Sequence, residues 1–429
     1  MNGASGPASA AARLWLAAAA TGVLATVATL AFHAAIRVIE FLSTATDSGL
    51  VAAARELSPG HRFLVSSVGA ILAGLVLQGG GRWAARGASG SAHIDYIDAA
   101  REGRVALNDR TTLVRSFSSL ISVGTGASIG REGPMVQLAA WLATWVGRIF
   151  PMPASDRSVL LACGIAAGIG SAYHAPIAGM VFVLELALGF LPKRSVVPVL
   201  VATGTSSGLL SWWTGPLPLY TMPSMPLVST NLGMAVLEGA LGGVLGWLFL
   251  RLLEVSRGAF RGIRSATVRL ALGGVLVGSI SVAVPEVWGN GYSVVSQILR
   301  EDSAWSWVAL ILAAKFAATI LSAGSGAIGG VFTPTLFLGA ASGHVLSHLA
   351  AMVDPAVSGD PRAVAVIGMA ATLAAVTHAP LMAMVMVLEM TSQFSLTIPV
   401  MLACGVAFAI STRFGALPLY GNPIEGRAA

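Results

Sequence analysis

Apolar segments alternate with short polar connections along almost the whole chain. Fourteen apolar segments can be drawn, at residues 12–32, 63–80, 112–128, 135–150, 158–170, 176–191, 196–213, 231–253, 267–284, 305–322, 332–351, 363–375, 380–391 and 396–411. The more polar connections are 43–62, 81–111, 214–230, 285–304 and 352–362. Because an apolar helix of about 20 residues crosses a bilayer, the pattern predicts an all-α integral membrane protein.

Several of the apolar segments are much shorter than a full crossing and are bounded by glycine or proline. A helix that stops inside a membrane exposes polar backbone groups, which is tolerated only where protein or a wet cavity surrounds them. The pattern therefore predicts many tilted and half-crossing helices around a polar site. The first span, which follows Arg13, is too long for a signal-peptide core and is predicted to continue as a tilted helix to about Phe41.

Composition supports the membrane assignment. Hydrophobic residues make up 55% of the chain and charged residues 10%, whereas a soluble domain carries roughly 25% charged residues. The transmembrane domain is predicted at residues 12–420, between a short N-terminal segment at 1–11 and a short tail at 421–429. No soluble regulatory domain is expected after the membrane part.

The net charge of +6 is carried mainly by arginine. The positive-inside tendency places one arginine-rich linker in the cytoplasm; the linker contains Arg251, Arg257, Arg261, Arg264 and Arg269. The chain is expected in the inner (plasma) membrane. No long basic run is present, so no nucleic-acid partner is expected. Cys163 and Cys404 lie in apolar segments and are predicted to be small core residues.

The chain repeats itself. Residues 124–134 align with 324–334 at an offset of 200, and His174-Ala-Pro176 with Glu185 recurs as His378-Ala-Pro380 with Glu389 at an offset of 204. Chance repetition of abundant glycine and alanine does not account for the matched His, Pro and Glu. Two homologous halves, at about 60–215 and 230–411, are typical of a transporter or channel with its substrate site between them. The repeat alone leaves parallel and inverted halves open.

The run Gly130-Arg131-Glu132-Gly133-Pro134 predicts a helix that starts inside the membrane. Proline suits the first helical turn, and the free N–H groups and positive dipole end at such a start favour an anion. Either a halide or the Glu132 carboxylate fits this position. We therefore predict that ionised Glu132 blocks anion passage and that protonated Glu132 swings away; a purely structural cap is the alternative.

The second copy, at residues 329–334, predicts the same kind of helix start without a carboxylate. The backbone N–H groups of Val331 and Phe332 are candidate ligands for the same anion.

These motifs, together with Pro418-Leu419-Tyr420, resemble the signature of ClC-type chloride channels and proton/chloride exchangers. The run Val-Trp-Gly-Asn-Gly-Tyr-Ser at 287–293 is most similar to the bacterial voltage-gated ClC-type branch. The resemblance covers nearly the whole chain. It implies a ClC-type fold of two inverted structural repeats without CBS domains, a homodimer in the lipid bilayer, and one chloride pathway per subunit. No cofactor and no enzymatic activity are implied.

The resemblance also implies an anion site. In the family, a serine hydroxyl, a tyrosine hydroxyl and backbone amides hold the central anion. The tyrosine matches Tyr420 and the serine matches Ser91, with Ser89 as the alternative, because the surrounding motif is degenerate. The implied anion-binding set is Ser91, Gly130, Arg131, Gly133, Gly330, Val331, Phe332 and Tyr420, with Glu132 as the gate. Arg131 is expected chiefly to pair structurally or to face the vestibule.

One departure from the family concerns proton transfer. The exchangers carry a second carboxylate directly after the position of Glu185, and this chain has Leu186 there. A leucine cannot relay a proton. The departure favours passive or weakly coupled chloride transport and leaves a proton-coupled exchanger as the alternative; Ser91 and Tyr420 favour chloride over fluoride only mildly, and nitrate remains open.

The remaining polar residues in apolar segments are predicted to have structural roles. Glu185 and Glu389 are expected to accept from backbone N–H groups of neighbouring half-helices, and His174 and His378 to pack at helix starts. Lys315 is expected to line the vestibule or to pair with a carboxylate, and the role of Glu238 is open. No spacing suggests a metal or a nucleotide, and a membrane enzyme using Glu132 lacks a nucleophile.

Overall fold

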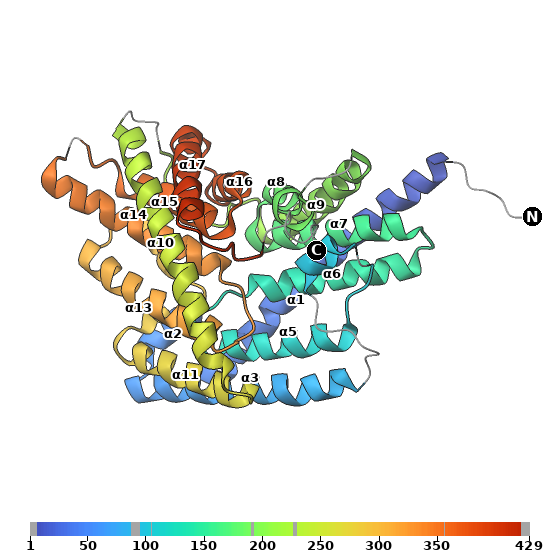
Figure 1. Ribbon diagram of the computed structural model, residues 1–429, viewed down its shortest axis with the longest axis horizontal. Helices are drawn as coiled ribbons and strands as arrows, with labels where there is room; N and C mark the ends of the chain where they lie inside the picture. Colours follow the sequence, from blue (N-terminus) through green and yellow to red (C-terminus); the bar gives the residue numbers. More distant parts are fainter. Residues whose placement is uncertain are drawn as a thin grey trace, which may run out of the picture.

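The computed structural model describes residues 7–86, 95–103, 105–189, 193–225, 230–355 and 357–421. The helices are α1 (Pro7–Thr44), α2 (Leu50–Glu56), α3 (Pro59–Ala85), α4 (Tyr96–Arg101), α5 (Asp109–Gly124), α6 (Glu132–Ile149), α7 (Ala154–Tyr173), α8 (Pro176–Phe182), α9 (Lys193–Thr214), α10 (Thr230–Arg261), α11 (Ala266–Ala283), α12 (Tyr292–Arg300), α13 (Trp305–Gly324), α14 (Phe332–Val353), α15 (Pro361–Thr377), α16 (Pro380–Thr391) and α17 (Thr397–Arg413), with helical turns η1 (Val183–Ala187), η2 (Pro285–Val287) and η3 (Phe394–Leu396). The predicted all-α class is confirmed (Figure 1).

Each predicted apolar segment is a helix in the structure. Among the described residues, eight helices are long and apolar enough to cross a membrane. The first helix extends past its predicted end, to Thr44, and the short helices predicted at the proline boundaries are α8 and α16. The predicted connections contain three further short helices, α2, α4 and α12, which are too short for an apolar period to reveal.

The arginine-rich linker is shorter than predicted. Helix α10 continues through Arg261 and α11 starts at Ala266, so only four residues separate them. Arg251 and Arg257 therefore lie on α10, and Arg269 lies on α11. The apolar pattern ends near residue 253 because the last two turns of α10 are polar, although the helix itself continues.

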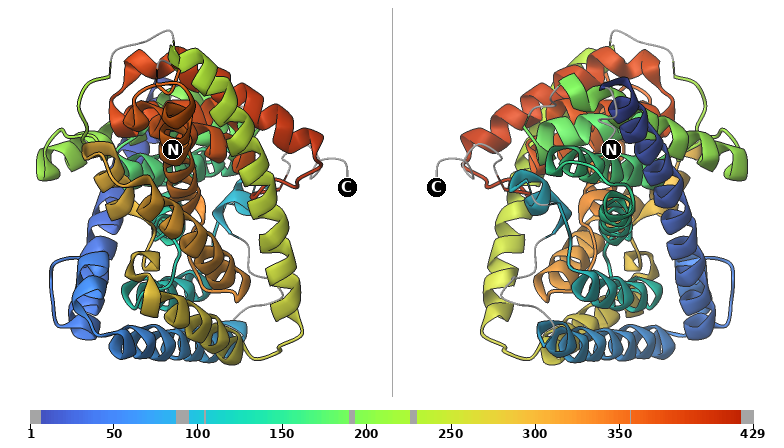
Figure 2. Two further views of the ribbon diagram at one scale, coloured as in Figure 1. Left: turned by 90° about the vertical axis from the view of Figure 1, so that its left-hand side faces the viewer. Right: turned by 90° about the vertical axis from the view of Figure 1, so that its right-hand side faces the viewer.

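The packing repeats in two units. Helix α1 packs on α5, α6, α7 and α9, and α10 packs correspondingly on α13, α14, α15 and α17. In Figure 1, α6, α7 and α9 lie on the right and α14, α15 and α17 on the left. Figure 2 shows α1 and α10 as long tilted helices on opposite sides of the molecule. The first unit therefore includes α1 and extends toward the N-terminus from the predicted start near residue 60.

The two units have opposite orientations. Their equivalent helices α3 and α11 pack side by side, with Gly74 against Thr267 and Gly278 against Phe63. The late part of one helix therefore meets the early part of the other, so the two helices run antiparallel. Equivalent helices that cross a membrane in opposite directions define inverted repeats, and the predicted fold of two inverted structural repeats is confirmed.

Candidate functional site

Two equivalent helix starts meet at the centre of the molecule. Helix α6 begins at Glu132 and α14 begins at Phe332. The Gly130 N–H donates to the Gly330 carbonyl oxygen at 2.6 Å, and the Gly330 N–H donates to the Gly130 carbonyl oxygen at 2.8 Å. This reciprocal pair holds the two starts together. The first-turn N–H groups of both helices lack intrahelical partners, so two positive dipole ends converge here.

The glycine pair limits which predicted residues can donate to an anion. The N–H groups of Gly130 and Gly330 are already engaged with each other. Direct donation is therefore better suited to the N–H groups of Gly133, Val331 and Phe332, which lie at the helix starts. Gly330 and Gly133 line a cavity of 130 Å³ together with Tyr420, so one member of the glycine pair, Gly330, contributes to its wall.

A larger cavity leads toward this site from one face of the molecule. It has a volume of 530 Å³ and reaches Gly329, Gly330, Val331 and Tyr420. Four arginines line it: Arg115, Arg257, Arg261 and Arg269; the same lining includes one carboxylate, Asp95. We call this cavity the arginine vestibule. Such an excess of positive charge raises the local concentration of anions.

Glu132 lies beside the helix starts with its side chain buried. The Asn290 side-chain amide donates to its Oε1 at 2.7 Å. Its Oε2 has no hydrogen-bond partner among the described residues. A Cβ atom on Gly130 would lie 2.2 Å from that Oε2, so glycine at position 130 leaves room for the carboxylate. The carboxylate is therefore docked against Asn290 and next to the paired glycines.

The loop that carries Asn290 is fixed by a buried lysine. The Lys315 ammonium donates to the carbonyl oxygens of Val287 at 3.0 Å and Gly289 at 2.9 Å, and to the Ser128 hydroxyl at 3.3 Å. Lys315 is fully buried, and its partners are carbonyls and a hydroxyl. The prediction that it lines the vestibule or pairs with a carboxylate is therefore wrong; it holds the 287–291 loop against the first unit.

Tyr420 is held by an arginine that the sequence did not single out. Arg101, on α4, donates from Nη1 to the Tyr420 carbonyl oxygen and from Nη2 to the Leu186 carbonyl oxygen at 2.8 Å. Partial burial lowers the pKa of the Arg101 guanidinium, and Asp98 and Asp95 act in the opposite direction. Arginine nevertheless keeps its charge in proteins, so a cation lies at the backbone of Leu186.

The remaining residues of the predicted anion-binding set are Ser91, with Ser89 as its alternative, and Arg131. Ser91 and the alternative Ser89 lie outside the described residues. Arg131 precedes α6 and is half-buried, and its charge interacts with that of Glu40 on α1. The expectation that Arg131 pairs structurally or faces the vestibule stays a prediction.

Each of the two other carboxylates of the repeat caps the start of a helix in the other unit. Glu185 accepts from the Leu381 N–H at 3.3 Å and the Met382 N–H at 2.7 Å, at the start of α16. Glu389 accepts from the Ile177 N–H at 3.1 Å and the Ala178 N–H at 2.7 Å, at the start of α8. The predicted structural role of both carboxylates is confirmed.

The histidines before these helices act locally. His174 and His378 end α7 and α15 in the left-handed conformation, with φ of 54° and 55°. The His174 ring bonds to the Leu217 carbonyl at 3.2 Å, and the His378 ring to the Ser411 hydroxyl at 3.2 Å. Both contacts support the predicted packing role.

Asn290 and Arg101 are the important residues that the sequence reasoning missed. Asn290 stands in the Gly-Asn-Gly run that was used only as a family resemblance. The polar side-chain amide of Asn290, placed between two glycines in a largely apolar chain, was the signal that could have indicated a functional contact. Arg101 gave no such signal, because its partners Leu186 and Tyr420 are far away in sequence.

Comparison with known proteins identifies the family of the chain. Residues 68–412 match the sequence profile of the family described as voltage gated chloride channel. A relative from Ralstonia nicotianae, named as a chloride channel protein like ClcB, is 44% identical over 414 residues, covering 94% of each chain. The voltage-gated ClC-type chloride channel ClcB of Citrobacter koseri is 38% identical, over 93% of this chain and 96% of the relative.

Solved structures agree on the fold. The crystal structure of a slow cyanobacterial Cl⁻/H⁺ antiporter matches with a TM-score of 0.82 at 23% identity, over 95% of this chain and 96% of that chain. A CLC-type fluoride/proton antiporter matches with a TM-score of 0.74 at 22% identity, over 94% and 95% of the two chains. At these identities the likeness concerns the fold alone.

Proposed function

Since the chain belongs to the voltage-gated chloride channel family, we propose that it passes chloride passively through a pathway gated by Glu132. The observation that carries the proposal is the Glu132 carboxylate next to the paired Gly130 and Gly330, where the α6 and α14 starts meet. A mobile negative group beside two positive helix ends competes with an anion for the same place.

The arginine vestibule supplies the entrance. Chloride collects among Arg115, Arg257, Arg261 and Arg269 because their charges outnumber the single nearby Asp95. The smaller cavity of 130 Å³ shares Gly330 and Tyr420 with the vestibule and also reaches Gly133. Chloride is then held by the Tyr420 hydroxyl, the Ser91 hydroxyl and first-turn N–H groups, of which the Ser91 contact rests on the family resemblance alone.

The gate has two positions. In the docked position, Glu132 accepts from Asn290 and leaves the helix starts free for chloride. In the blocking position, the ionised carboxylate occupies the N–H groups of the helix starts itself. A protonated carboxyl has no charge to offer the positive helix ends, so acid favours the docked position. Chloride and the carboxylate exclude each other because both are anions.

Passive transport is favoured over coupled exchange by the surroundings of Leu186. Its side chain is apolar, and the Arg101 guanidinium lies 2.8 Å from its carbonyl oxygen. A cation at this position repels a proton arriving from the vestibule side. The relatives' names describe channels. Two of the matching structures are titled as antiporters, so proton-coupled exchange is the competing function to be tested.

Chloride efflux from liposomes tests the gate. We expect wild-type efflux to rise by at least about tenfold between neutral and acidic pH. A change of about 1.4 kcal/mol in the free-energy difference between the blocking and docked positions of Glu132 is enough for this effect. Glu132→Ala should give fast efflux with little pH dependence, and Glu132→Gln should behave in the same way. Unchanged pH dependence in both variants would contradict the gating proposal.

Reversal potentials test the coupling. With a chloride gradient and an imposed pH gradient, passive transport places the reversal potential at the chloride equilibrium potential. A shift with the pH gradient would show exchange despite Leu186. Repeating the measurement with nitrate or fluoride identifies the preferred anion. We further propose that the protein is a homodimer of the inner membrane, which mass measurement in detergent and membrane fractionation test.

A further inference from the structure

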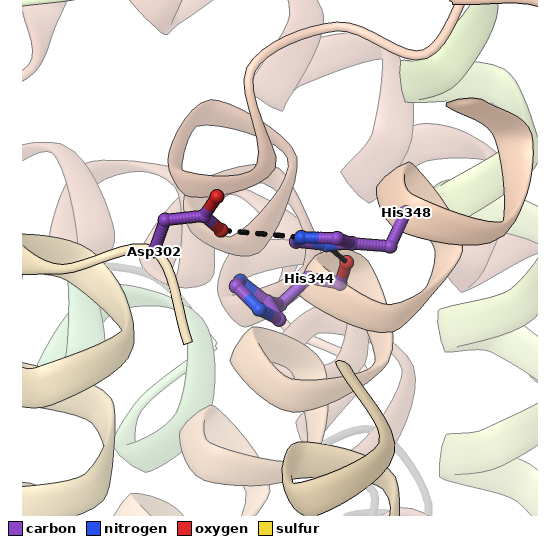
Figure 3. Close-up of side chains that lie close together, drawn as sticks. All are labelled: Asp302, His344 and His348. Carbon is purple, nitrogen blue, oxygen red and sulfur yellow. Dashed lines mark hydrogen bonds and ion pairs between the residues drawn. The ribbon is translucent and has the colours of Figure 1, made fainter. Parts of the chain in front are cut away.

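A second cluster of polar side chains consists of Asp302, His344 and His348 (Figure 3). Asp302 lies in the connection between α12 and α13, and His344 and His348 lie one turn apart in the later half of α14. Asp302 is exposed, His348 is partly buried and His344 is fully buried. One ligand atom from each of the three residues lies within 4.8 Å of the other two.

The hydrogen bonds of His344 define which nitrogen carries its proton. The His344 Nε2 lies 2.8 Å from the Ser303 carbonyl oxygen. A carbonyl only accepts, so Nε2 carries the hydrogen and Nδ1 keeps a bare lone pair. That Nδ1 is buried and has no hydrogen-bond partner among the described residues. A buried acceptor without a partner costs free energy unless a ligand satisfies it.

His348 is oriented in the same manner. Its Nδ1 lies 3.0 Å from the His344 carbonyl oxygen, which makes Nδ1 the donor in the neutral ring. Its Nε2 then carries the lone pair and lies 3.1 Å from the Asp302 carboxylate. A lone pair and a carboxylate repel each other at this distance. Either a proton or a metal cation must lie between them.

We propose that Asp302, His344 and His348 bind one divalent transition-metal ion of the zinc class. Zinc takes imidazole nitrogens and carboxylate oxygens at about 2.0–2.1 Å in a tetrahedron, which sets neighbouring ligand atoms about 3.3 Å apart. The His348 and Asp302 atoms already have nearly this spacing, at 3.1 Å. Two imidazoles select against calcium and magnesium, which prefer oxygen ligands.

The surroundings of the three residues suit a metal site. The carbonyls of Ser303 and His344 hold the two rings in the tautomers that a metal requires, which is the usual task of outer-shell partners. The exposed side chain of Asp302 gives an ion a path into the site from solvent. Water would fill the fourth position.

The site lies on the face opposite the arginine vestibule. The end of α13 is beside the arginine-rich end of α10, because Ser256 donates to the Ile320 carbonyl at 3.1 Å. Asp302 precedes the other end of α13, which begins at Trp305. If the arginines are cytoplasmic, a metal reaches the site from outside the cell. Binding would tie the 301–304 connection to α14, the helix whose start contributes to the anion site.

Zinc binding to the purified full-length protein, carrying no histidine tag, tests the site. We expect equilibrium dialysis to give one Zn²⁺ per chain. His348→Ala and Asp302→Asn should each weaken binding by at least about tenfold, because even outer-shell changes cost 10–100-fold. The matched control is His61→Ala, which removes an exposed imidazole elsewhere and should bind zinc as the wild type does. Co²⁺ in place of Zn²⁺ should give the visible absorption of a tetrahedral nitrogen–oxygen site.

Two outcomes would overturn the assignment. One is that the wild type binds no zinc at about 100 μM, a concentration well above the dissociation constant expected of a three-ligand site. His348 would then simply form an ion pair with Asp302. The other is equal binding by the wild type and both site variants. His348 and Asp302 are the positions to change, because removal of the fully buried His344 could disturb folding. Gel filtration and chloride efflux confirm that each variant is folded.

Discussion

The starts of α6 and α14 are equivalent by the repeat, yet they differ in one respect. Both follow a glycine-rich turn, both have proline in the first turn, and Gly130 and Gly330 form two reciprocal hydrogen bonds. The α6 start carries Glu132 and the α14 start carries Phe332. Phe332 packs on Tyr173 with ring centroids 5.1 Å apart, whereas Glu132 reaches Asn290.

Under the proposed function, this difference would separate the binding of an anion from the control of its passage. Two converging helix ends are needed to favour an anion inside a membrane, and the symmetry provides both. A removable negative group is needed only once, and a second one would repel the first. The apolar Phe332 therefore suits a half that, in the proposed mechanism, binds the anion without gating it.

The variant with the largest expected effect on this comparison places a carboxylate at the helix start of both halves. Phe332→Glu should lower chloride efflux at neutral pH by about a hundredfold, because either of two carboxylates can then occupy the helix starts and both repel chloride; about 2.8 kcal/mol corresponds to this change. The measurement is efflux from liposomes between neutral and acidic pH, where acid should restore much of the flux.

Phe332→Gln is the matched control, with the same shape and no charge. It should keep most of the wild-type efflux at neutral pH. Equal losses in the Glu and Gln variants would mean that packing on Tyr173, and not charge, explains the result.

A second test compares the glycines that turn the chain into the two starts. Gly126 and Gly326 have φ of 96° and 90°, a region that favours glycine. A Cβ atom on Gly126 would lie 2.5 Å from the Trp288 ring, whereas on Gly326 it would meet nothing nearer than 3.9 Å. Gly126→Ala should therefore cost about 2–5 kcal/mol by adding overpacking to backbone strain.

Gly326→Ala should cost only the strain, about 1–2 kcal/mol. Thermal denaturation in one detergent, followed by loss of the monodisperse protein, gives the order of stability. Equal losses would show that the 287–291 loop yields easily and does not fix Asn290.

A smaller test addresses Asn290 itself. Asn290→Ala removes the donor that holds Glu132 in the docked position. A hydrogen bond to a charged group contributes about 1.5–3 kcal/mol, so efflux at neutral pH should fall by about tenfold or more. The low-pH efflux should stay near the wild-type value, because a protonated Glu132 does not block.

The double variant Glu132→Ala/Asn290→Ala distinguishes gating from damage to the loop. If Asn290 acts through Glu132, the second change should have no effect once Glu132 is gone. A further loss in the double variant would assign Asn290 a role in holding the loop, where its Oδ1 also accepts from the Tyr292 N–H at 3.1 Å.

The sequence predicted the features that depend on local pattern and on the repeat. Every apolar segment became a helix, and the two motif starts met as the repeat implied. Contacts between distant residues were not predictable in the same way. The wrong assignment of Lys315 shows why: its partners are carbonyls of a loop, which leave no trace in residue type.

The metal cluster illustrates the same limit. The spacing of four between His344 and His348 puts two imidazoles on one helix face, and this signal was passed over. Asp302 lies more than 40 residues earlier, so only the packing of the α12–α13 connection on α14 completes the cluster. The two histidines of such a site can be recognised in a sequence, whereas the carboxylate is recognised only once the fold is known.

The smallest difference between the halves is expected at Glu185 and Glu389, the two carboxylates with equivalent contacts. Glu185 and Glu389 each accept from two N–H groups at a helix start in the other unit, with nearly matching distances. Glu185→Gln and Glu389→Gln should each destabilise the protein by about 1–3 kcal/mol, and the two losses should agree within about 0.5 kcal/mol. Efflux should keep its pH dependence in both. A loss of pH dependence in Glu185→Gln alone would mean that this carboxylate takes part in proton transfer despite Leu186, and the two halves would then differ at a second place besides Glu132.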